Sequence, residues 1–162
     1  MEIREIRGVK TLFAHAKYDI ELDFESLKLI DINEKRIGIV SNIQTSSILE
    51  EIKNYLEKKN HDVIIAGQIV GCNASKALAI KNDVDSFLFV GSGMFHPLEL
   101  IEKTKIKHYY HFNPIMKTFS KLDEKELTKL EKVKQSKLAK YFNSEKIGIL
   151  VSTKPGQEEL KL

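Results

Sequence analysis

The single cysteine of the chain, Cys72, lies between a predicted strand and a predicted helix, in the segment GQIVGCN at residues 67–73. A thiol just before a helix lies near the positive end of the helix dipole, which favours the thiolate. The thiolate is the form that binds a metal or attacks an electrophile. A lone cysteine is also commonly a small buried hydrophobic residue. Position alone leaves both interpretations open.

Glycine, amide and hydroxyl residues follow the predicted strands of this chain. Such groups hold small polar ligands through hydrogen bonds. His96 lies among them, but it precedes Pro97 and could simply close a turn, and Gly91 and Gly93 could be turn glycines. Cys72 with His96 would suit a thiol enzyme, although no orienting acid is evident. The strand-end segments are residues 42–45, 67–72, 91–96, 113–114 and 152–157.

Short apolar runs alternate with amphipathic segments, which is typical of strands and helices in βαβ order. This order predicts an α/β fold with an open, mostly parallel sheet and helices on both faces, a Rossmann-like or flavodoxin-like three-layer sandwich. Ligand sites in such sheets lie beyond the carboxyl ends of the strands. We expect strands at residues 9–16, 36–41, 62–66, 86–90, 107–112 and 146–151, and helices at 24–29, 47–58, 74–81, 98–103 and 123–142.

Composition describes a globular chain of 162 residues, 42% of them hydrophobic and 30% charged. No segment approaches the roughly 18 apolar residues of a membrane span, and the first residues lack a signal-peptide core. We therefore expect a cytoplasmic protein without a membrane partner. The net charge is only +3, with three arginines, which argues against nucleic-acid binding. One cysteine excludes an internal disulfide and cannot by itself form a zinc site.

Three separated motifs resemble the diphthamide-synthesis enzyme family, the 2-(3-amino-3-carboxypropyl)histidine synthases. They are GQIVGCN at residues 67–73, FVGSGMFHP at 89–97 and GILVSTKPGQ at 148–157. The segment IGIVSNIQ at residues 37–44 also fits the family pattern of a strand that ends in a glutamine. Three motifs in the right order are far more specific than any one of them.

The resemblance implies a transferase with three similar α/β domains, each giving one cysteine to a 4Fe-4S cluster. Members use S-adenosylmethionine to form a 3-amino-3-carboxypropyl radical, which is attached to a histidine of translation elongation factor 2 in the first step of diphthamide biosynthesis. Members are also reported to work as dimers, and the resemblance implies an enzyme of the archaeal type. By motif position, Cys72 would bind the cluster, and the residues near S-adenosylmethionine would be Gln44, Gln68, Gly91, Gly93, His96 and Gln157.

The chain departs from the family pattern because cysteines matching the first and third domains are absent. Residues 1–34 resemble the end of a preceding domain, residues 35–145 the middle domain, and residues 146–162 the first strand and loop of a third. We therefore expect a partial component whose missing cysteines come from other chains or domains, in a homo- or hetero-oligomer. A fragment, a split protein and a degenerate paralogue all fit. The alternative from another class is a non-catalytic binding or assembly module in which Cys72 is merely buried.

Overall fold

A computed structural model describes residues 2–6, 8–14, 17–70, 73–122 and 124–148 of the chain. Residues His15–Asp123 form one compact unit, which contains the main sheet. The other unit holds an antiparallel hairpin of β1 (Glu2–Ile6) and β2 (Val9–Phe13) and the long helix α5 (Glu124–Phe142).

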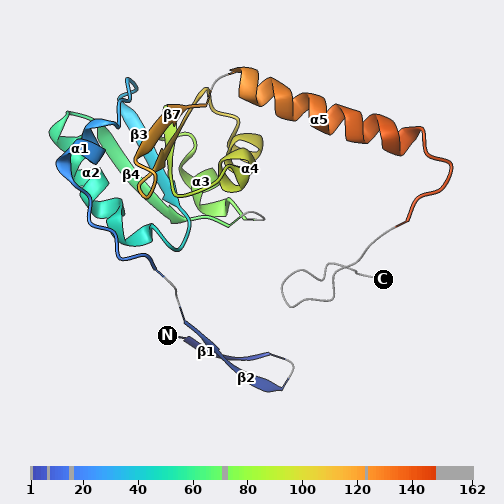
Figure 1. Ribbon diagram of the computed structural model, residues 1–162, viewed down its shortest axis with the longest axis horizontal. Helices are drawn as coiled ribbons and strands as arrows, with labels where there is room; N and C mark the ends of the chain where they lie inside the picture. The colour runs from blue at the N-terminus through green and yellow to red at the C-terminus, as the bar shows by residue number, and fades with distance from the viewer. Residues whose placement is uncertain (1, 7, 15–16, 71–72, 123, 149–162) are drawn as a thin grey trace. The chain divides into compact units, whose positions relative to one another are not determined.

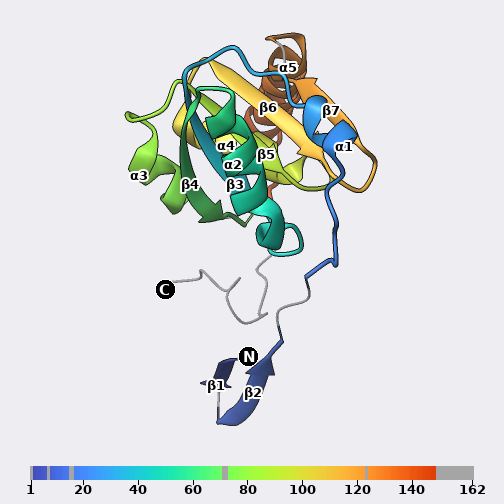
Figure 2. The same cartoon turned by 90° about the vertical axis from the view of Figure 1, so that its left-hand side faces the viewer.

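The compact unit is built on a five-stranded sheet in the order β4-β3-β5-β6-β7 (Figures 1 and 2). The first four strands in this order are parallel, and β7 runs antiparallel to β6 at the edge. The prediction of an open, mostly parallel α/β sheet is therefore confirmed. The strands are β3 (Arg36–Ser41), β4 (Asp62–Gln68), β5 (Ser86–Val90), β6 (His108–Asn113) and β7 (Thr118–Lys121).

Helices cover both faces of this sheet, as the βαβ order predicted (Figure 1). Helices α1 (Phe24–Lys28) and α2 (Leu49–Lys58) pack on one face, and α2 follows a 3-10 turn, η1 (Ser46–Ile48). Helices α3 (Ser75–Ile80) and α4 (Phe95–Thr104) pack on the other. The central strands are thus shielded from water on both sides.

Alternation along β5 explains why its sequence is a continuous apolar run. Leu88 and Val90 belong to the core under α1 and α2, whereas Phe87 and Phe89 belong to the core under α3 and α4. All five residues of β5 are buried. A parallel strand between two helical layers needs apolar side chains on both faces.

Two antiparallel strands were missing from the sequence prediction. The expected strand at residues 9–16 is instead the second strand of the β1–β2 hairpin. The expected alternation also missed β7, which follows β6 through a four-residue turn at residues 114–117 that contains no glycine. Lys117 takes the left-handed conformation there, with φ of 49°. For the strand expected at residues 146–151, residues 146–148 have no regular structure and the rest lie outside the described residues.

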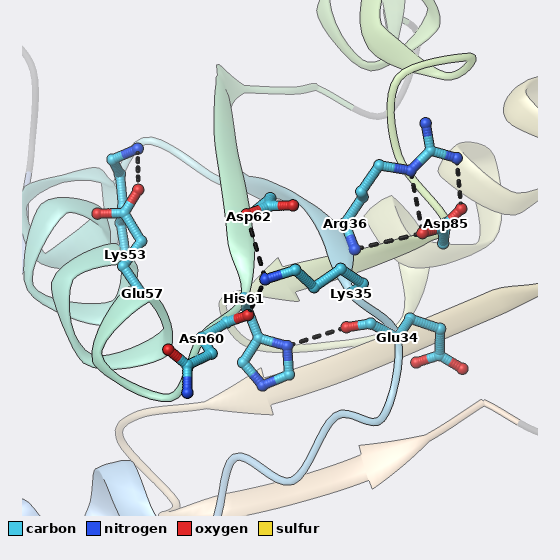
Figure 3. Close-up of polar contacts among 9 residues, drawn as sticks. All are labelled: Glu34, Lys35, Arg36, Lys53, Glu57, Asn60, His61, Asp62 and Asp85. Carbon is cyan, nitrogen blue, oxygen red and sulfur yellow. Dashed lines mark hydrogen bonds and ion pairs between the residues drawn. The ribbon is translucent and has the colours of Figure 1, made fainter.

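Ion pairs link residues at the amino ends of the parallel strands (Figure 3). Arg36 at the start of β3 contacts Asp85 just before β5, with Nη2–Oδ1 at 2.6 Å and Nε–Oδ2 at 3.1 Å. This bidentate hydrogen bonding lowers the pKa of Asp85 and raises that of Arg36. Lys35 lies between Asp62 and the carbonyl of Asn60. These contacts join segments that are distant in sequence at the edge opposite the expected ligand site.

Candidate functional site at the carboxyl edge of the sheet

The strand order reverses direction between β3 and β5, which is the place where open α/β sheets have their ligand crevice. The chain leaves β3 through α2 toward β4, and it leaves β5 through α4 toward β6 on the opposite side. Such a reversal separates the two loops at the ends of neighbouring strands, and ligands of open α/β sheets bind there. The loop after β3 carries Gln44, and the loop after β5 carries Gly91 and Gly93.

One row of paired residues marks this carboxyl edge. Gln68 of β4 pairs with Ser41 of β3, Ser41 with Val90 of β5, and Val90 with Phe112 of β6. The strands β4, β3, β5 and β6 therefore end side by side at this edge. The parallel sheet brings Gln44, Gln68, Gly91, Gly93 and His96 to one edge.

A bulge in β4 sets the position of Gln68. Ile65 pairs with Ile39, but the next residue of β3, Val40, pairs with Gly67, so Ala66 is an extra residue. Gly67 has φ of +95°, a conformation that favours glycine. Without this extra residue Gln68 would point to the other face of the sheet, because side chains alternate along a strand. Gln68 is half-buried beside Ser41.

The loop after β3 is fixed by two buried polar side chains. Asn42 Oδ1 accepts a hydrogen bond from the backbone N–H of Thr45 at 3.2 Å and lies 2.9 Å from Thr45 Oγ1. Thr45 Oγ1 lies 2.7 Å from the carbonyl oxygen of Val90. This hydroxyl links the loop after β3 to the end of β5. Gln44 lies between these two anchors, half-buried, and its carbonyl accepts from the N–H of Tyr18 at 2.9 Å.

Gly91 and Gly93 differ in what they do for the loop after β5. Gly91 is buried, and a Cβ there would lie 2.9 Å from both Asn42 Nδ2 and Phe89 Cζ, so close packing requires glycine. Gly93 is exposed with φ of +75°, and a Cβ would meet nothing within 4 Å. Gly93 therefore leaves open space beside the backbone, whereas the space beside Gly91 is filled by the protein's own packing.

His96 lies in the first turn of α4, which begins at Phe95, three residues earlier than the predicted start. Its half-buried ring packs near Phe89, with ring centroids 5.9 Å apart. His111 of β6 also packs near Phe89, at 5.6 Å, and its Nε2 lies 2.7 Å from the carbonyl oxygen of Gly91. The structure thus places two imidazoles against one phenylalanine below the loop.

Two expected site residues, Cys72 and Gln157, lie outside the described residues. The residues around the cysteine segment are placed: Val70 and Asn73 exchange two backbone hydrogen bonds, at 2.9 and 3.2 Å. Among the described residues, no group of three His, Cys, Asp or Glu side chains could hold a metal ion.

Ser41 and His111 are site residues that sequence reasoning did not single out. The Ser41 hydroxyl is fully buried at the edge row and has no hydrogen-bond partner within the described structure. An unpaired buried hydroxyl costs free energy unless a ligand or water satisfies it. The only available signal for Ser41 was its place at the end of an apolar strand. His111 gave none, because its role depends on the neighbouring strand.

Polar groups at this edge suit a small molecule with hydrogen-bonding groups. Strongly shifted pKa values are found elsewhere: a hydrogen bond from Lys117 lowers the pKa of Asp23, and burial beside Glu34 raises the pKa of Tyr110. The edge offers amide side chains, exposed backbone at Ser92 and Gly93, and an imidazole. Such groups bind and orient a ligand more readily than they provide a general acid and base.

The amino-acid sequence matches a family model described as "Putative diphthamide synthesis protein" over residues 2–162. A relative named 2-(3-amino-3-carboxypropyl)histidine synthase, from Pyrococcus horikoshii, is 33% identical over 135 residues, covering 78% of this chain and 37% of the relative. The relative of the same name from Methanocaldococcus jannaschii is 29% identical over 160 residues, covering 92% of this chain and 42% of the relative. The chain thus spans less than half the length of these relatives.

Solved structures give the same result. The crystal structure of Dph2 from Pyrococcus horikoshii is similar with a TM-score of 0.73 and 30% identity, over 89% of this chain and 44% of that one. A structure of the same protein with a 4Fe-4S cluster gives a TM-score of 0.67 and 32% identity, over 81% and 38%. Within the described residues, no helix is long and apolar enough to cross a membrane. Sequence and fold agree that this chain belongs to the diphthamide synthesis protein family.

Proposed function

We propose that this chain forms the Cys72-bearing part of a 2-(3-amino-3-carboxypropyl)histidine synthase and acts in the first step of diphthamide biosynthesis. In this step the 3-amino-3-carboxypropyl group of S-adenosylmethionine is transferred to a histidine of translation elongation factor 2. The observation that carries the proposal is the family match, which runs through residues 2–162. Residues 35–145 correspond to the middle of three domains, residues 1–34 to the end of the first, and residues 146–162 to the start of the third.

Cys72 is the proposed ligand of a 4Fe-4S cluster. Clusters of this type are held by cysteine thiolates. The chain has one thiol and so supplies one cysteine ligand to a cluster. The structure of the Pyrococcus horikoshii relative with a 4Fe-4S cluster supports an iron–sulfur cofactor for this proposal. When bound, the cluster supplies the electron that cleaves a carbon–sulfur bond of S-adenosylmethionine. The other ligands come from further chains or domains.

The carboxyl-edge loops hold S-adenosylmethionine in this proposal. Gln44 and Gln68 offer amide groups from neighbouring strands, and Gly93 lets the ligand approach the backbone because no side chain fills that space. His96 adds an imidazole at the start of α4, and Gln157 adds an amide from the third motif. Gly91 serves indirectly, since its missing side chain lets Asn42 and Phe89 pack against the loop. The Ser41 hydroxyl is a further candidate donor.

The partners follow from the reaction. The macromolecular substrate is elongation factor 2, and a homo- or hetero-oligomer supplies the remaining cysteines, in the cytoplasm. The second candidate, a non-catalytic binding or assembly module, is favoured by the single cysteine. Both candidates use the same crevice, but only the first needs the thiol.

Anaerobic reconstitution with iron and sulfide separates the two candidates. The chain is tested alone and as a hybrid in which it replaces the matching segment of the Pyrococcus horikoshii relative, read by visible absorbance and electron paramagnetic resonance. We expect a 4Fe-4S signal in the hybrid that is lost or strongly altered in Cys72→Ser and retained in Ser75→Ala, a change at an exposed residue nearby. An unchanged cluster in the folded Cys72→Ser hybrid would refute the ligand assignment and leave the binding module.

A further inference from the structure

His111 makes a contact that the proposed function does not use. It lies on β6, half-buried, with Nε2 2.7 Å from the carbonyl oxygen of Gly91. A carbonyl oxygen only accepts hydrogen bonds, so the Nε2 of His111 must carry the proton. In a neutral imidazole this fixes the Nε2–H tautomer and leaves Nδ1 without a proton. The contact therefore specifies both the position and the protonation pattern of the ring.

Gly91 is held from several directions at once. Its N–H donates to the carbonyl of Phe112 at 2.9 Å, and its carbonyl accepts from His111. A Cβ on Gly91 would lie 2.9 Å from Asn42 Nδ2 and from the ring of Phe89, so neighbours fill the space around Cα. The peptide planes on both sides of Gly91 are thus constrained, which fixes the direction in which the chain leaves β5.

The exposed part of the loop begins immediately after this fixed residue. Ser92 and Gly93 are exposed, and Gly93 has φ of +75° with no protein atom near its open side. Both residues follow directly on Gly91 in the chain. Their orientation therefore depends on the anchor at Gly91. The His111 ring also packs against Phe89, which in turn packs near His96 of α4.

We propose that His111 is a positioning residue: through the carbonyl of Gly91 it sets the orientation of the Ser92–Gly93 backbone at the crevice. Thr45 performs the matching task from the other side, because its hydroxyl contacts the carbonyl of Val90, one residue earlier. The two contacts together hold the loop after β5 in the conformation that receives the ligand. The choice of S-adenosylmethionine as that ligand rests on the proposed function, whereas the contact itself does not.

Three variants of the full chain test the role of the imidazole. His111→Phe keeps an aromatic ring against Phe89 but removes the donor. His111→Gln places an amide N–H at the reach of Nε2 and should restore the hydrogen bond. His108→Phe is the control, because His108 lies on the same strand at the opposite edge and contacts Glu34, with Nδ1–Oε1 at 3.3 Å.

Nuclear magnetic resonance reads the loop without any ligand. We expect the amide signals of Gly91 and Gly93 to shift in His111→Phe. The exchange of the Gly91 amide, which donates to the carbonyl of Phe112, should rise about tenfold, in line with the removal of one hydrogen bond to a buried acceptor. His111→Gln and His108→Phe should keep the wild-type signals. The nitrogen shifts of the wild-type imidazole should show the Nε2–H tautomer, a measurement that needs no variant to fold.

The second arm is a titration with S-adenosylmethionine of the hybrid with the Pyrococcus horikoshii relative, in its wild-type form and with the same substitutions. We expect affinity to fall about tenfold in His111→Phe and to recover in His111→Gln. Unchanged loop signals in His111→Phe, or an Nδ1–H tautomer in the wild type, would overturn the positioning role. Absence of S-adenosylmethionine binding to the wild-type hybrid would instead count against the proposed function, while the loop signals still decide the role of His111.

Discussion

Replacing Thr45 with valine tests whether the two strand-end loops are joined by a hydroxyl. Thr45 is fully buried, and its Oγ1 lies 2.7 Å from the Val90 carbonyl oxygen and 2.9 Å from Asn42 Oδ1. A hydroxyl has one proton, so it donates to only one of these acceptors at a time. Valine has the same shape but cannot donate. The substitution therefore leaves both buried acceptors without the hydroxyl as a hydrogen-bond partner.

The expected size follows from two opposing terms. Removal of the hydrogen bond from a buried acceptor costs about 2 kcal/mol, whereas a buried methyl in place of a hydroxyl gains about 0.8 kcal/mol at most. We expect Thr45→Val to lower the free energy of unfolding by about 1 to 2 kcal/mol, which lowers Tm by about 4 to 8 °C for a domain of this size. Thr45→Ser keeps the hydroxyl and removes only a methyl, at about 1 kcal/mol.

Far-UV circular dichroism during thermal and urea unfolding measures both variants, since the chain has no tryptophan. Nuclear magnetic resonance compares the amide signals of the loop after β5 in the same variants. Thr45→Val should perturb the amide signals of Gly91, and Thr45→Ser should not. A Thr45→Val protein as stable as the wild type or more stable, with unchanged Gly91 signals, would refute the bridging role because burial alone predicts a gain.

Three further predictions concern other parts of the compact unit. Gly38→Ala should cost about 1 to 3 kcal/mol in urea unfolding, because its Cβ would lie 2.5 Å from Phe87 Cε1. Gly93→Ala has open space around it and should cost about 1 kcal/mol from its left-handed backbone; a larger loss in Gly93→Ala than in Gly38→Ala would contradict this. Tyr110 donates to Glu34 at 2.8 Å, and burial beside that carboxylate raises the pKa of the phenol. The stabilisation from this contact is therefore present below the ordinary phenol pKa of about 10 and is lost as pH rises above it. Spectrophotometric titration should show one late-titrating phenol fewer in Tyr110→Phe, and the loss of an early-titrating phenol would be inconsistent with this. Asp23 pairs with Lys117 at 2.6 Å, which lowers the pKa of the Asp23 carboxyl. The stabilisation from this pair is present above the unfolded-state pKa of about 4 and is lost as pH falls. Lys117→Met should therefore unfold at a higher pH than the wild type in an acid titration, and Lys28→Met should show a smaller shift of the unfolding pH.

The parallel core of the fold could be predicted because its sequence signals are local. The apolar run of β5 is buried on both faces, and α2 shows buried residues at helical spacing, Leu49, Ile52 and Leu56. The edge strand β7 was missed since it is short, lies at the sheet edge and follows a turn without glycine. Three of its four residues are exposed and one is half-buried, so its sequence TFSK contains no apolar run.

The site was predictable at the level of loops but not of individual contacts. The rule that ligands bind beyond the carboxyl ends of parallel strands led to the loops that carry Gln44, Gly91 and Gly93. The different roles of Gly91 and Gly93 could be seen only in the structure, because Gly91 is required by the packing of Asn42 and Phe89 around it. The role of His111 likewise depends on the adjacent strand, because β5 and β6 are paired in the sheet although a loop and the helix α4 separate them in the chain.

Mass spectrometry of elongation factor 2 tests the central claim most directly. The hybrid that carries this chain in place of the matching segment of the Pyrococcus horikoshii relative is incubated anaerobically with the factor, S-adenosylmethionine and a reductant. We predict the mass increase of one 3-amino-3-carboxypropyl group on a histidine, and its loss in the folded Cys72→Ser hybrid. Modification that persists without Cys72, or none from a hybrid that is folded and holds its cluster, would contradict the account.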